Sequence, residues 1–210
     1  MVMKALYDEF ALTLVDRPRG ADWSAFADLY QEVFPPWERE PLLRVATRVT
    51  TGRYRLTVLR LADEPVAGFH LLDQVVELDY AVLTFLALRQ AFRGRGLGQR
   101  LLQDAVSRFQ TTSGPTWLFV EAEAGPAHFY QSYGFRRLIL DYRVPHYGSG
   151  AAIQSMALLT VHRDGRVSPI DGKLIRRIIE HLFVDGYQVR PDDPRLAAQL
   201  QRVPDIVGVG

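Results

Sequence analysis

The chain has 210 residues, of which 48% are apolar and 23% are charged, a composition typical of a globular protein with a substantial core. It contains no cysteine, which excludes disulfides, cysteine-bound zinc, iron–sulfur clusters and a cysteine nucleophile. The formal net charge is +1 and no apolar run nears the roughly 20 residues of a bilayer span, so we expect a cytoplasmic protein that binds neither nucleic acid nor membranes.

Residues 1–90 predict one strand, two helices and three further strands. The helices are indicated by apolar residues at helical spacing, the first with Asp22 as its cap. The strand pattern is clearest where Tyr54, Leu56 and Val58 alternate with polar residues. The expected strands are 5–15, 54–58, 66–72 and 77–88, with a turn at 63–65, and the expected helices are 22–33 and 38–50. The second helix should turn inward Leu42, Leu43, Ala46 and Val49.

Residues 91–165 predict a glycine-arginine loop, an amphipathic helix and further strands. Because strands joined by a helical crossover are parallel, residues 80–88 and 117–122 should be parallel neighbours. The earlier strands, joined by short turns, should be antiparallel. The remaining helices are expected at 97–109 and 126–134, and the last strands at 135–144 and 155–162. The predicted fold is α/β of the α+β type, with one mixed, mostly antiparallel sheet and helices on both faces.

Residues 166–210 should form a C-terminal helical extension, so the expected domains are 1–165 and 166–210. Ser168 would cap a helix with Pro169 at its first position and Asp171 at its third. The apolar stripe of this helix must be buried. We expect it to pack against its own domain, and the alternative is a homodimer contact. The stripe comprises Leu174, Ile175, Ile178, Ile179, Leu182 and Phe183. The tail at 191–210 is expected to be loosely held.

The segment from Phe92 to Leu102 has the features of a phosphate-binding loop. It reads Phe-Arg-Gly-Arg-Gly-Leu-Gly-Gln-Arg-Leu-Leu, follows a buried strand and opens a helix. Unpaired amides at a helix N-terminus attract anions, glycines let a phosphate approach them, and the arginines add countercharge. The segment lacks the Gly-Lys-Ser/Thr ending of a P-loop, and Gln99 stands where a dinucleotide-binding motif has its third glycine.

The pattern that this loop does fit is Arg/Gln-x-x-Gly-x-Gly/Ala, present as Arg93-Gly-Arg-Gly96-Leu-Gly98. It resembles the pyrophosphate loop of the GNAT superfamily of N-acetyltransferases, whose donor is acetyl-CoA. Residues 83–88 are similar to the central strand of that family. The stretch Ala127-His-Phe-Tyr-Gln-Ser-Tyr-Gly-Phe135 resembles a segment of that family through its Phe-Tyr-x-x-x-Gly-Phe pattern. The resemblance covers residues 5–162 and leaves residues 166–210 outside.

The resemblance implies where the cofactor binds. In this family two parallel strands splay apart, and the pantetheine arm of the donor adds to the first strand as an extra strand would. Carried over, the strand at 83–88 holds that arm through its backbone, and the loop holds the pyrophosphate. The implied cofactor-binding residues are Leu86, Ala87, Leu88, Arg93, Gly94, Arg95, Gly96, Leu97, Gly98, Gln99 and Phe129.

The resemblance also implies direct transfer of the acetyl group to an amine. An alkylammonium with a pKa near 10 must first lose a proton, and the oxyanion needs a donor, for which the Leu88 N–H is the candidate. Tyr130 stands where the family has its general acid, and Tyr133 is the less favoured candidate. Glu121 matches the general-base glutamate of ribosomal-protein N-terminal acetyltransferases. The alternatives for the base are Glu123, Asp79, Glu77 and a bound water.

The acceptor side of the site is marked by Trp37, Glu38 and Tyr142, the candidate substrate-binding residues. His146 and Tyr147 are further candidates to line it. One departure from the family concerns residues 123–126, which are fewer than usual and lack an asparagine that many members have there. The five histidines show no metal-binding spacing, so no metal is expected.

These observations predict an acetyl-CoA-dependent N-acetyltransferase that acts on a primary amine of a small molecule or peptide. Two alternatives stay open. One is a catalytically silent CoA-binding sensor or scaffold of the same fold, and the other is an acyltransferase that uses a longer acyl-CoA. The sequence does not identify the acceptor amine.

Overall fold

The computed structural model describes residues 10–61, 66–111, 113–148 and 152–210. By its internal contacts the chain divides into two compact units that do not follow chain order. Unit 1 comprises Met1–Pro35, Pro41–Gln74 and Leu83–Thr112, and unit 2 comprises Pro36–Glu40, Val75–Val82 and Ser113–Gly210. Within the described ranges, no helix is both long and apolar enough to cross a bilayer.

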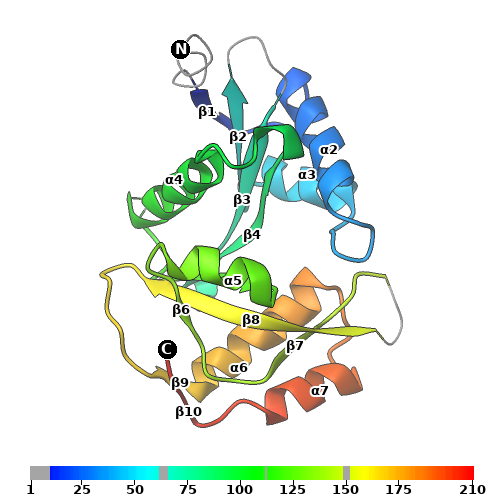
Figure 1. Cartoon of the computed structure of the whole chain (residues 1–210). Helices are drawn as coiled ribbons and strands as arrows, with labels where there is room; N and C mark the ends of the chain where they lie inside the picture. Colours follow the sequence, from blue (N-terminus) through cyan, green and yellow to red (C-terminus); the bar gives the residue numbers. More distant parts are fainter. Residues whose placement is uncertain (1–9, 62–65, 112, 149–151) are drawn as a thin grey trace. The chain divides into compact units, whose positions relative to one another are not determined.

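Unit 1 joins antiparallel strands to helices (Figure 1). Its strands are β1 (Phe10–Val15), β2 (Tyr54–Leu61), β3 (Gly68–Val75) and the part of β4 (Tyr80–Leu88) that begins at Leu83. Its helices are α2 (Ala21–Val33), α3 (Leu42–Thr50) and α4 (Leu97–Thr111), the last preceded by the short turn η2 (Gln90–Phe92). β2 pairs antiparallel with both β1 and β3.

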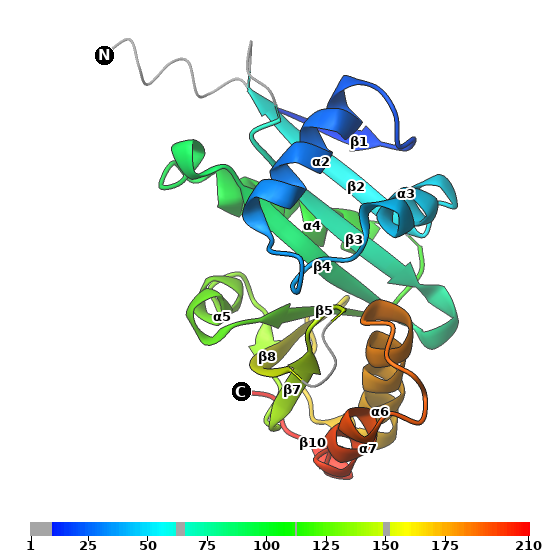
Figure 2. The same cartoon turned by 90° about the vertical axis from the view of Figure 1, so that its right-hand side faces the viewer.

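The helices of unit 1 cover both faces of its strands (Figure 2). Because side chains alternate along a strand, each strand supplies residues to both faces. On one face, α2 places Phe26 edge-on against Phe69 of β3, with ring centroids 4.7 Å apart. On the other face, Leu97 and Leu101 of α4 share an apolar cluster with Leu59 of β2.

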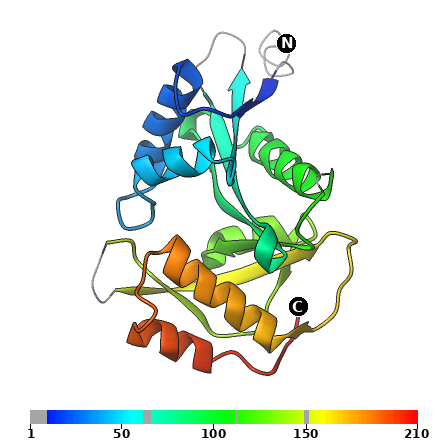
Figure 3. The same cartoon turned by 180° about the vertical axis from the view of Figure 1, so that it is seen from behind.

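Unit 2 contains the start of β4 and the remaining elements (Figure 3). Its other strands are β5 (Trp117–Ala122), β6 (Arg136–Arg137), β7 (Tyr142–Pro145), β8 (Ile153–His162), β9 (Ile170–Asp171) and β10 (Ile206–Val207). Its helical elements are η1 (Val76–Leu78), α5 (Ala124–Gln131), α6 (Gly172–His181), η3 (Leu182–Gly186), which continues α6, and α7 (Pro194–Gln201). β8 is antiparallel to β5, β6 and β7.

The strands hydrogen-bond in the order β1-β2-β3-β4-β5-β8-β6, with β7 paired to β8 off this path. β4 and β5 form the parallel pair, in which Tyr80–Val82 lie opposite Trp117–Phe119. This pair is joined through α4, as expected for a strand-helix-strand crossover. The predicted fold class, a mixed and mostly antiparallel sheet with helices around it, is therefore confirmed.

The C-terminal extension is part of the core of unit 2. The apolar stripe of α6 and η3 is buried in one cluster with Phe119, Tyr142 and Leu158 of the strands, so the stripe packs on its own chain as predicted. Leu196 and Val203 from the tail are buried in the same cluster. The prediction of a loosely held tail is wrong, because α7 and the following residues supply apolar side chains to this core.

The start of α6 also differs from the prediction. Asp171, not Ser168, caps the helix, since its carboxylate accepts a hydrogen bond from the Lys173 N–H at 2.8 Å. The chain before that point pairs as β9 with β10, which places the helix start three residues later than expected. A sequence pattern that fits a capping motif was therefore overridden by strand pairing with the tail.

Gly172 is required by the close approach of the tail to this helix start. Its N–H donates to the carbonyl oxygen of Asp205 at 2.7 Å. A Cβ added at Gly172 would lie 2.0 Å from the carbonyl oxygen of Pro204, far inside any real contact. Any larger residue at this position would separate the tail from α6.

The predicted helix at 38–50 is wrong in its start and in one of its four predicted inward residues, Leu43. It begins at Leu42, with Pro41 as N-cap. Leu43 is 82% exposed, whereas Val45 is fully buried and Arg48 nearly so. Val49 is buried and Leu42 packs against the core as predicted, and Val45 takes the inward place that the prediction gave to Leu43.

Smaller differences concern other element ends. α2 has Gly20 as its N-cap, so Asp22 lies in the first turn, where it pairs with Arg60 at 3.0 Å. The strand predicted at 135–144 is divided into β6 and β7 by a turn. The short helix α5 begins at Ala124, two residues before the predicted start. The turn at 63–65 and residues 5–9 of the first predicted strand lie outside the described residues.

Candidate active site

The loop between β4 and α4 in unit 1 has a backbone that depends on glycine. Gly94 and Gly96 have φ of 75° and 77°, the left-handed region that other residues adopt only at a cost. The N–H of Arg100 donates to the carbonyl of Gly96 at 3.2 Å, which is the first bond of the helix. The amides of Leu97, Gly98 and Gln99 therefore have no acceptor within α4.

The surroundings of these amides are open. A Cβ added at Gly98 would meet no atom within 4 Å, and one at Gly96 would meet only the Gln99 side chain, at 3.7 Å. Unpaired amides at the positive end of a helix, with no side chain in front of them, make an anion-binding site. The loop thus has the left-handed glycines and the open helix start that phosphate binding would use, and the binding itself stays a prediction.

The arginines of the loop are exposed, but their guanidinium groups lie against their own unit. Arg93 donates through Nε to the carbonyl of Leu88 at 3.2 Å. The guanidinium carbon of Arg95 lies 5.9 Å from the centre of the Phe92 ring. The helix amides are therefore the groups directly available to an anion, and the arginines supply charge around them.

The strand that precedes the loop is closely packed against β3. Ala87 and Leu88 are buried, and Leu86 is partly exposed. The Arg89 N–H donates to the carbonyl of Ala67 at 2.8 Å. A Cβ on Gly68 of β3 would lie 2.7 Å from the carbonyl oxygen of Ala87, so only glycine permits this approach. The predicted role of residues 86–88 in holding a pantetheine arm, and the splay of the parallel strands, stay predictions.

Glu121, the candidate base, lies on β5 in unit 2 with each carboxylate oxygen engaged by a tyrosine. The Tyr142 hydroxyl donates to Oε1, and the Tyr187 hydroxyl donates to Oε2 at 3.1 Å. Desolvation raises the pKa of Glu121 above its ordinary value, and it outweighs the two hydrogen bonds, which lower that pKa. A carboxylate with a raised pKa is a stronger base near neutral pH.

The same tyrosines connect Glu121 to the predicted acceptor residues. The rings of Tyr147 and Tyr187 lie 4.9 Å apart, and the Tyr147 N–H donates to the carbonyl of Trp37 at 2.8 Å. Desolvation raises the pKa of Tyr187 well above its ordinary value, and among the charges that add to this effect is Glu38. We name Glu121, Tyr142, Tyr147 and Tyr187, with Trp37 and Glu38, the Glu121 cluster.

Exposure differs among the predicted acceptor residues. Trp37 is 48% exposed, and Glu38 is partly buried. Tyr142 is buried, and its hydroxyl is bound to Glu121. Tyr187 was missed by the sequence analysis, because it lies 66 residues beyond Glu121 and no local pattern marks it.

Tyr130, the candidate acid, lies on α5 in unit 2 and is 9% exposed. Its ring packs against Phe129 at 5.3 Å and Phe135 at 5.8 Å. Desolvation raises the pKa of Tyr130 to about 12. Its hydroxyl has no hydrogen-bond partner among the described residues, so it is a protonated phenol with a donor to offer. Tyr133, the alternative, is partly exposed and packs its ring 5.5 Å from that of Phe129.

The other carboxylates considered as a base have other surroundings. Glu123 is exposed and accepts a hydrogen bond from Gln154 Nε2 at 2.5 Å. Asp79 has a left-handed backbone with φ of 58°. Its carboxylate accepts a hydrogen bond from the Thr116 N–H at 2.8 Å, so it has a structural role. Glu77 is exposed. Glu121 differs from these three in having a raised pKa and two phenol donors.

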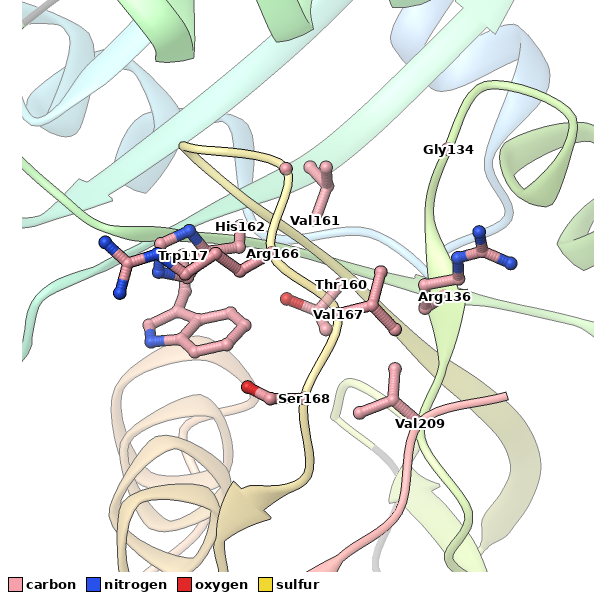
Figure 4. A pocket seen from close by; sticks show the side chains of 11 residues that line it. Trp117, Gly134, Arg136, Thr160, Val161, His162, Arg166, Val167, Ser168 and Val209 are labelled. Carbon is pink, nitrogen blue, oxygen red and sulfur yellow. The ribbon is translucent and has the colours of Figure 1, made fainter.

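A separate pocket of unit 2 contains none of the predicted site residues (Figure 4). Trp117, His162, Val167 and Val209 line it together with two arginines. The guanidinium groups of Arg136 and Arg166 lie on opposite sides in this view, so they do not converge on one anion. In the part of the chain that the structure describes, no group of three or more histidine or acidic side chains is arranged to hold a metal ion.

The mixed sheet and the glycine loop before α4 are the features on which the predicted resemblance to an acetyltransferase family rested. Residues 52–137 match the family model for an acetyltransferase (GNAT) domain. This match, with the shared fold of GNAT-family structures, confirms the predicted resemblance to the GNAT superfamily. No curated protein matches the chain in sequence.

Solved structures agree with this assignment. A GNAT-family protein from Bacteroides thetaiotaomicron is 21% identical, with a TM-score of 0.66 over 86% of this chain and 99% of that one. The ribosomal-protein-S18-alanine N-acetyltransferase of Escherichia coli is 19% identical, with a TM-score of 0.57 over 73% and 94%. A GNAT-family acetyltransferase of Elizabethkingia anophelis with acetyl-CoA bound is 17% identical, with a TM-score of 0.55 over 74% and 99%. Identities this low show a shared fold alone.

Proposed function

We propose that the protein transfers the acetyl group of acetyl-CoA to a primary amine of a small molecule or peptide. The observation that carries this proposal is the loop at 93–99, whose two left-handed glycines leave the first amides of α4 open to an anion. The family match over the same region and the acetyl-CoA bound to a protein of the same fold support it.

In the proposed complex, the loop holds the pyrophosphate of acetyl-CoA. The amides of Leu97, Gly98 and Gln99 donate to it, and the arginines offset its charge. The pantetheine arm lies along residues 86–88, and the Leu88 N–H donates to the thioester oxygen as it becomes an oxyanion. The Arg93 side chain must leave the Leu88 carbonyl if the arm is to use that acceptor.

The proposed chemistry uses two groups of unit 2. Glu121 takes a proton from the acceptor ammonium, directly or through a water, and the free amine attacks the thioester carbon. A carbon–nitrogen bond forms, the carbon–sulfur bond breaks, and the nitrogen releases its remaining extra proton. Tyr130 donates a hydrogen bond, or its proton, to the leaving thiolate. The raised pKa of Glu121 suits it to the first step.

The acceptor is proposed to be a cationic amine that reaches Trp37 and Glu38. An exposed indole and a carboxylate attract an ammonium group, the first through its ring face and the second by charge. Tyr142 contributes through its hydrogen bond to Glu121. A small metabolite and a peptide N-terminus both satisfy these requirements.

The test is a thiol-release assay with purified protein and acetyl-CoA against a panel of amines. The panel contains a polyamine, an amino-acid amide, an aminoglycoside and an alanine-terminated peptide, with octanoyl-CoA as a parallel donor. Release of CoA above the rate without amine supports the proposal. Tight CoA binding by calorimetry with no thiol release from any amine would instead identify a silent CoA-binding protein. Turnover with octanoyl-CoA alone would identify a longer-chain acyltransferase.

A further inference from the structure

A residue from outside the matched domain reaches the candidate base. The family match ends at residue 137, and the motifs that resemble the family end before the extension at 166–210. Tyr187 lies in this extension, directly after η3, and its hydroxyl donates to Glu121 Oε2 at 3.1 Å. Both residues belong to unit 2, so the contact lies within one compact unit.

The backbone around Tyr187 is held by hydrogen bonds on both sides. Its own N–H donates to the carbonyl of Leu182 at 2.9 Å, and the N–H of Val189 donates to the carbonyl of Phe183 at 2.9 Å. Gln188 between them has φ of 60°, a left-handed turn that directs the chain away after the tyrosine. These two backbone hydrogen bonds and the turn at Gln188 therefore fix the direction of the Tyr187 side chain.

The ring of Tyr187 is also packed on two sides. Phe183, which is 1% exposed, lies 6.1 Å away by ring centroids. The ring of Tyr147, two residues after the end of β7, lies 4.9 Å away. A phenol fixed by its backbone and by two neighbouring rings loses little further entropy when its hydroxyl binds a carboxylate. Tyr187 is therefore preorganised toward Glu121.

We propose that Tyr187 is a positioning residue for Glu121, and that the C-terminal extension thereby controls the general base. Tyr142 and Tyr187 each hold one oxygen of the carboxylate, which sets its plane and keeps it ionised. The remaining lone pairs of both oxygens are left for the acceptor amine. This inference rests on the proposed function, in which Glu121 is the base.

The two tyrosine hydroxyls are the groups that stabilise the Glu121 carboxylate. Among the described residues, they are the side chains that hydrogen-bond to this carboxylate, and no arginine or lysine pairs with it. Tyr80, which is hydrogen-bonded to His181 Nδ1 at 2.5 Å, adds to the raised pKa of Tyr142. Glu38 and Tyr147 add to the raised pKa of Tyr187. Loss of one phenol donor therefore leaves a partly buried carboxylate with one hydrogen bond from a tyrosine instead of two.

The direction of the expected change follows from the hydrogen bond. A bond to the ionised carboxylate favours the charged form, so removing it raises the proton affinity of Glu121. The base would then be protonated up to a higher pH. The acidic limb of the rate profile should move to higher pH, whereas a residue with only a packing role would lower the rate equally at all pH values.

The experiment compares wild-type protein with Tyr187→Phe, which keeps the ring, and with Arg190→Gln as a matched control. Arg190 lies three residues further on, is exposed, and pairs with Asp192 at 2.8 Å. The pH dependence of kcat/KM is measured by thiol release with acetyl-CoA and the best amine of the panel. In parallel, the carboxyl carbon of Glu121 is titrated by carbon-13 NMR in glutamate-labelled full-length protein, which needs no acceptor.

For Tyr187→Phe we expect kcat/KM on the acidic limb to fall by about tenfold, with less than about twofold change on the alkaline plateau. The NMR titration should move to higher pH, and Arg190→Gln should match wild type in both measurements. An active wild type with an unchanged Tyr187→Phe profile and titration would overturn this inference alone. A wild type that acetylates no amine would overturn the proposed function, and this inference with it.

Discussion

Burial acts in the same direction on Glu121 and Tyr130, but with different consequences for their proposed tasks. Desolvation raises the pKa of Glu121, which makes its carboxylate a stronger base. Desolvation also raises the pKa of Tyr130 to about 12. A thiol has a pKa of about 8.5, so full proton transfer from such a phenol to a thiolate is uphill. Tyr130 is therefore expected to act chiefly as a hydrogen-bond donor to the leaving sulfur.

Replacing Tyr130 by phenylalanine tests this expectation. Because a thiolate leaves fairly well without full protonation, kcat should fall by about tenfold to a hundredfold, at the low end of general-acid effects. The KM for acetyl-CoA should change by less than about twofold, because the hydroxyl acts mainly in the transition state. Both constants are measured by thiol release, with Tyr133→Phe as the matched comparison. Wild-type turnover in Tyr130→Phe, with the loss found in Tyr133→Phe, would transfer the role to Tyr133.

At the scale of elements, the loop and helix at 93–111 could be predicted from the sequence in detail. The helix expected at 97–109 is α4, whose buried residues recur at helical spacing, and the glycines mark the turn before it. The same reasoning was wrong at one position of the helix that begins at Leu42, where Val45 is buried and Leu43 is exposed. A short helix with apolar residues on more than one side has no unique phase until it meets the sheet.

The loop prediction can be tested with Gly96→Glu. A glutamate side chain would bring negative charge beside the amides of α4 and repel a pyrophosphate, so CoA affinity should fall by at least about a hundredfold. The matched control is Gly52→Glu, also in unit 1, where φ is 75° and an added Cβ meets no atom within 4 Å. Both variants carry the cost of a left-handed non-glycine residue, about 1 kcal/mol. Calorimetry that finds wild-type CoA affinity in Gly96→Glu would remove the loop from the proposal.

The contact between β3 and α4 predicts a pH dependence of stability. His70 is fully buried and lies 2.7 Å from Asp104, measured from Nε2 to Oδ2. Desolvation lowers the pKa of His70, although its hydrogen bond to Asp104 acts to raise it. The unfolded chain therefore binds this proton first as the pH falls through the ordinary histidine pKa of about 6.5. The contribution of neutral His70 to the free energy of unfolding is therefore complete above that pH. It is lost progressively as the pH falls below it.

Denaturant titrations at a series of pH values would measure this effect. The free energy of unfolding of the wild type should decrease as the pH falls below about 6.5, and His70→Gln should remove that part of the slope. His128→Gln, at an exposed position on α5, is the control and should keep the wild-type slope. A wild-type free energy that stays constant across this range would contradict the assignment of a buried neutral histidine.

At the scale of the whole molecule, the fold class was predictable and the use of the C-terminal extension was not. Strand alternation and the crossover through α4 are local signals, and they were sufficient for the mixed sheet. The contact of Tyr187 with Glu121 joins residues 66 positions apart and has no local signature. The same is true of the tail, whose approach to Gly172 depends on pairing between β9 and β10. Long-range contacts of this kind emerge only from the folded chain.

The tail supplies the last prediction, because the structure makes it part of the core of unit 2. Leu196 of α7 is 2% exposed, whereas Leu43 of α3 is 82% exposed, so the same substitution at both positions compares burial directly. Leu196→Ala should lower the free energy of unfolding by about 2–4 kcal/mol, from lost apolar burial and the cavity left behind. Leu43→Ala should change it by less than about 0.5 kcal/mol. Denaturant unfolding of both variants measures the difference. Equal, small effects would mean that the tail is held as loosely as its sequence first indicated, and would weaken the case for control of Glu121 by the extension.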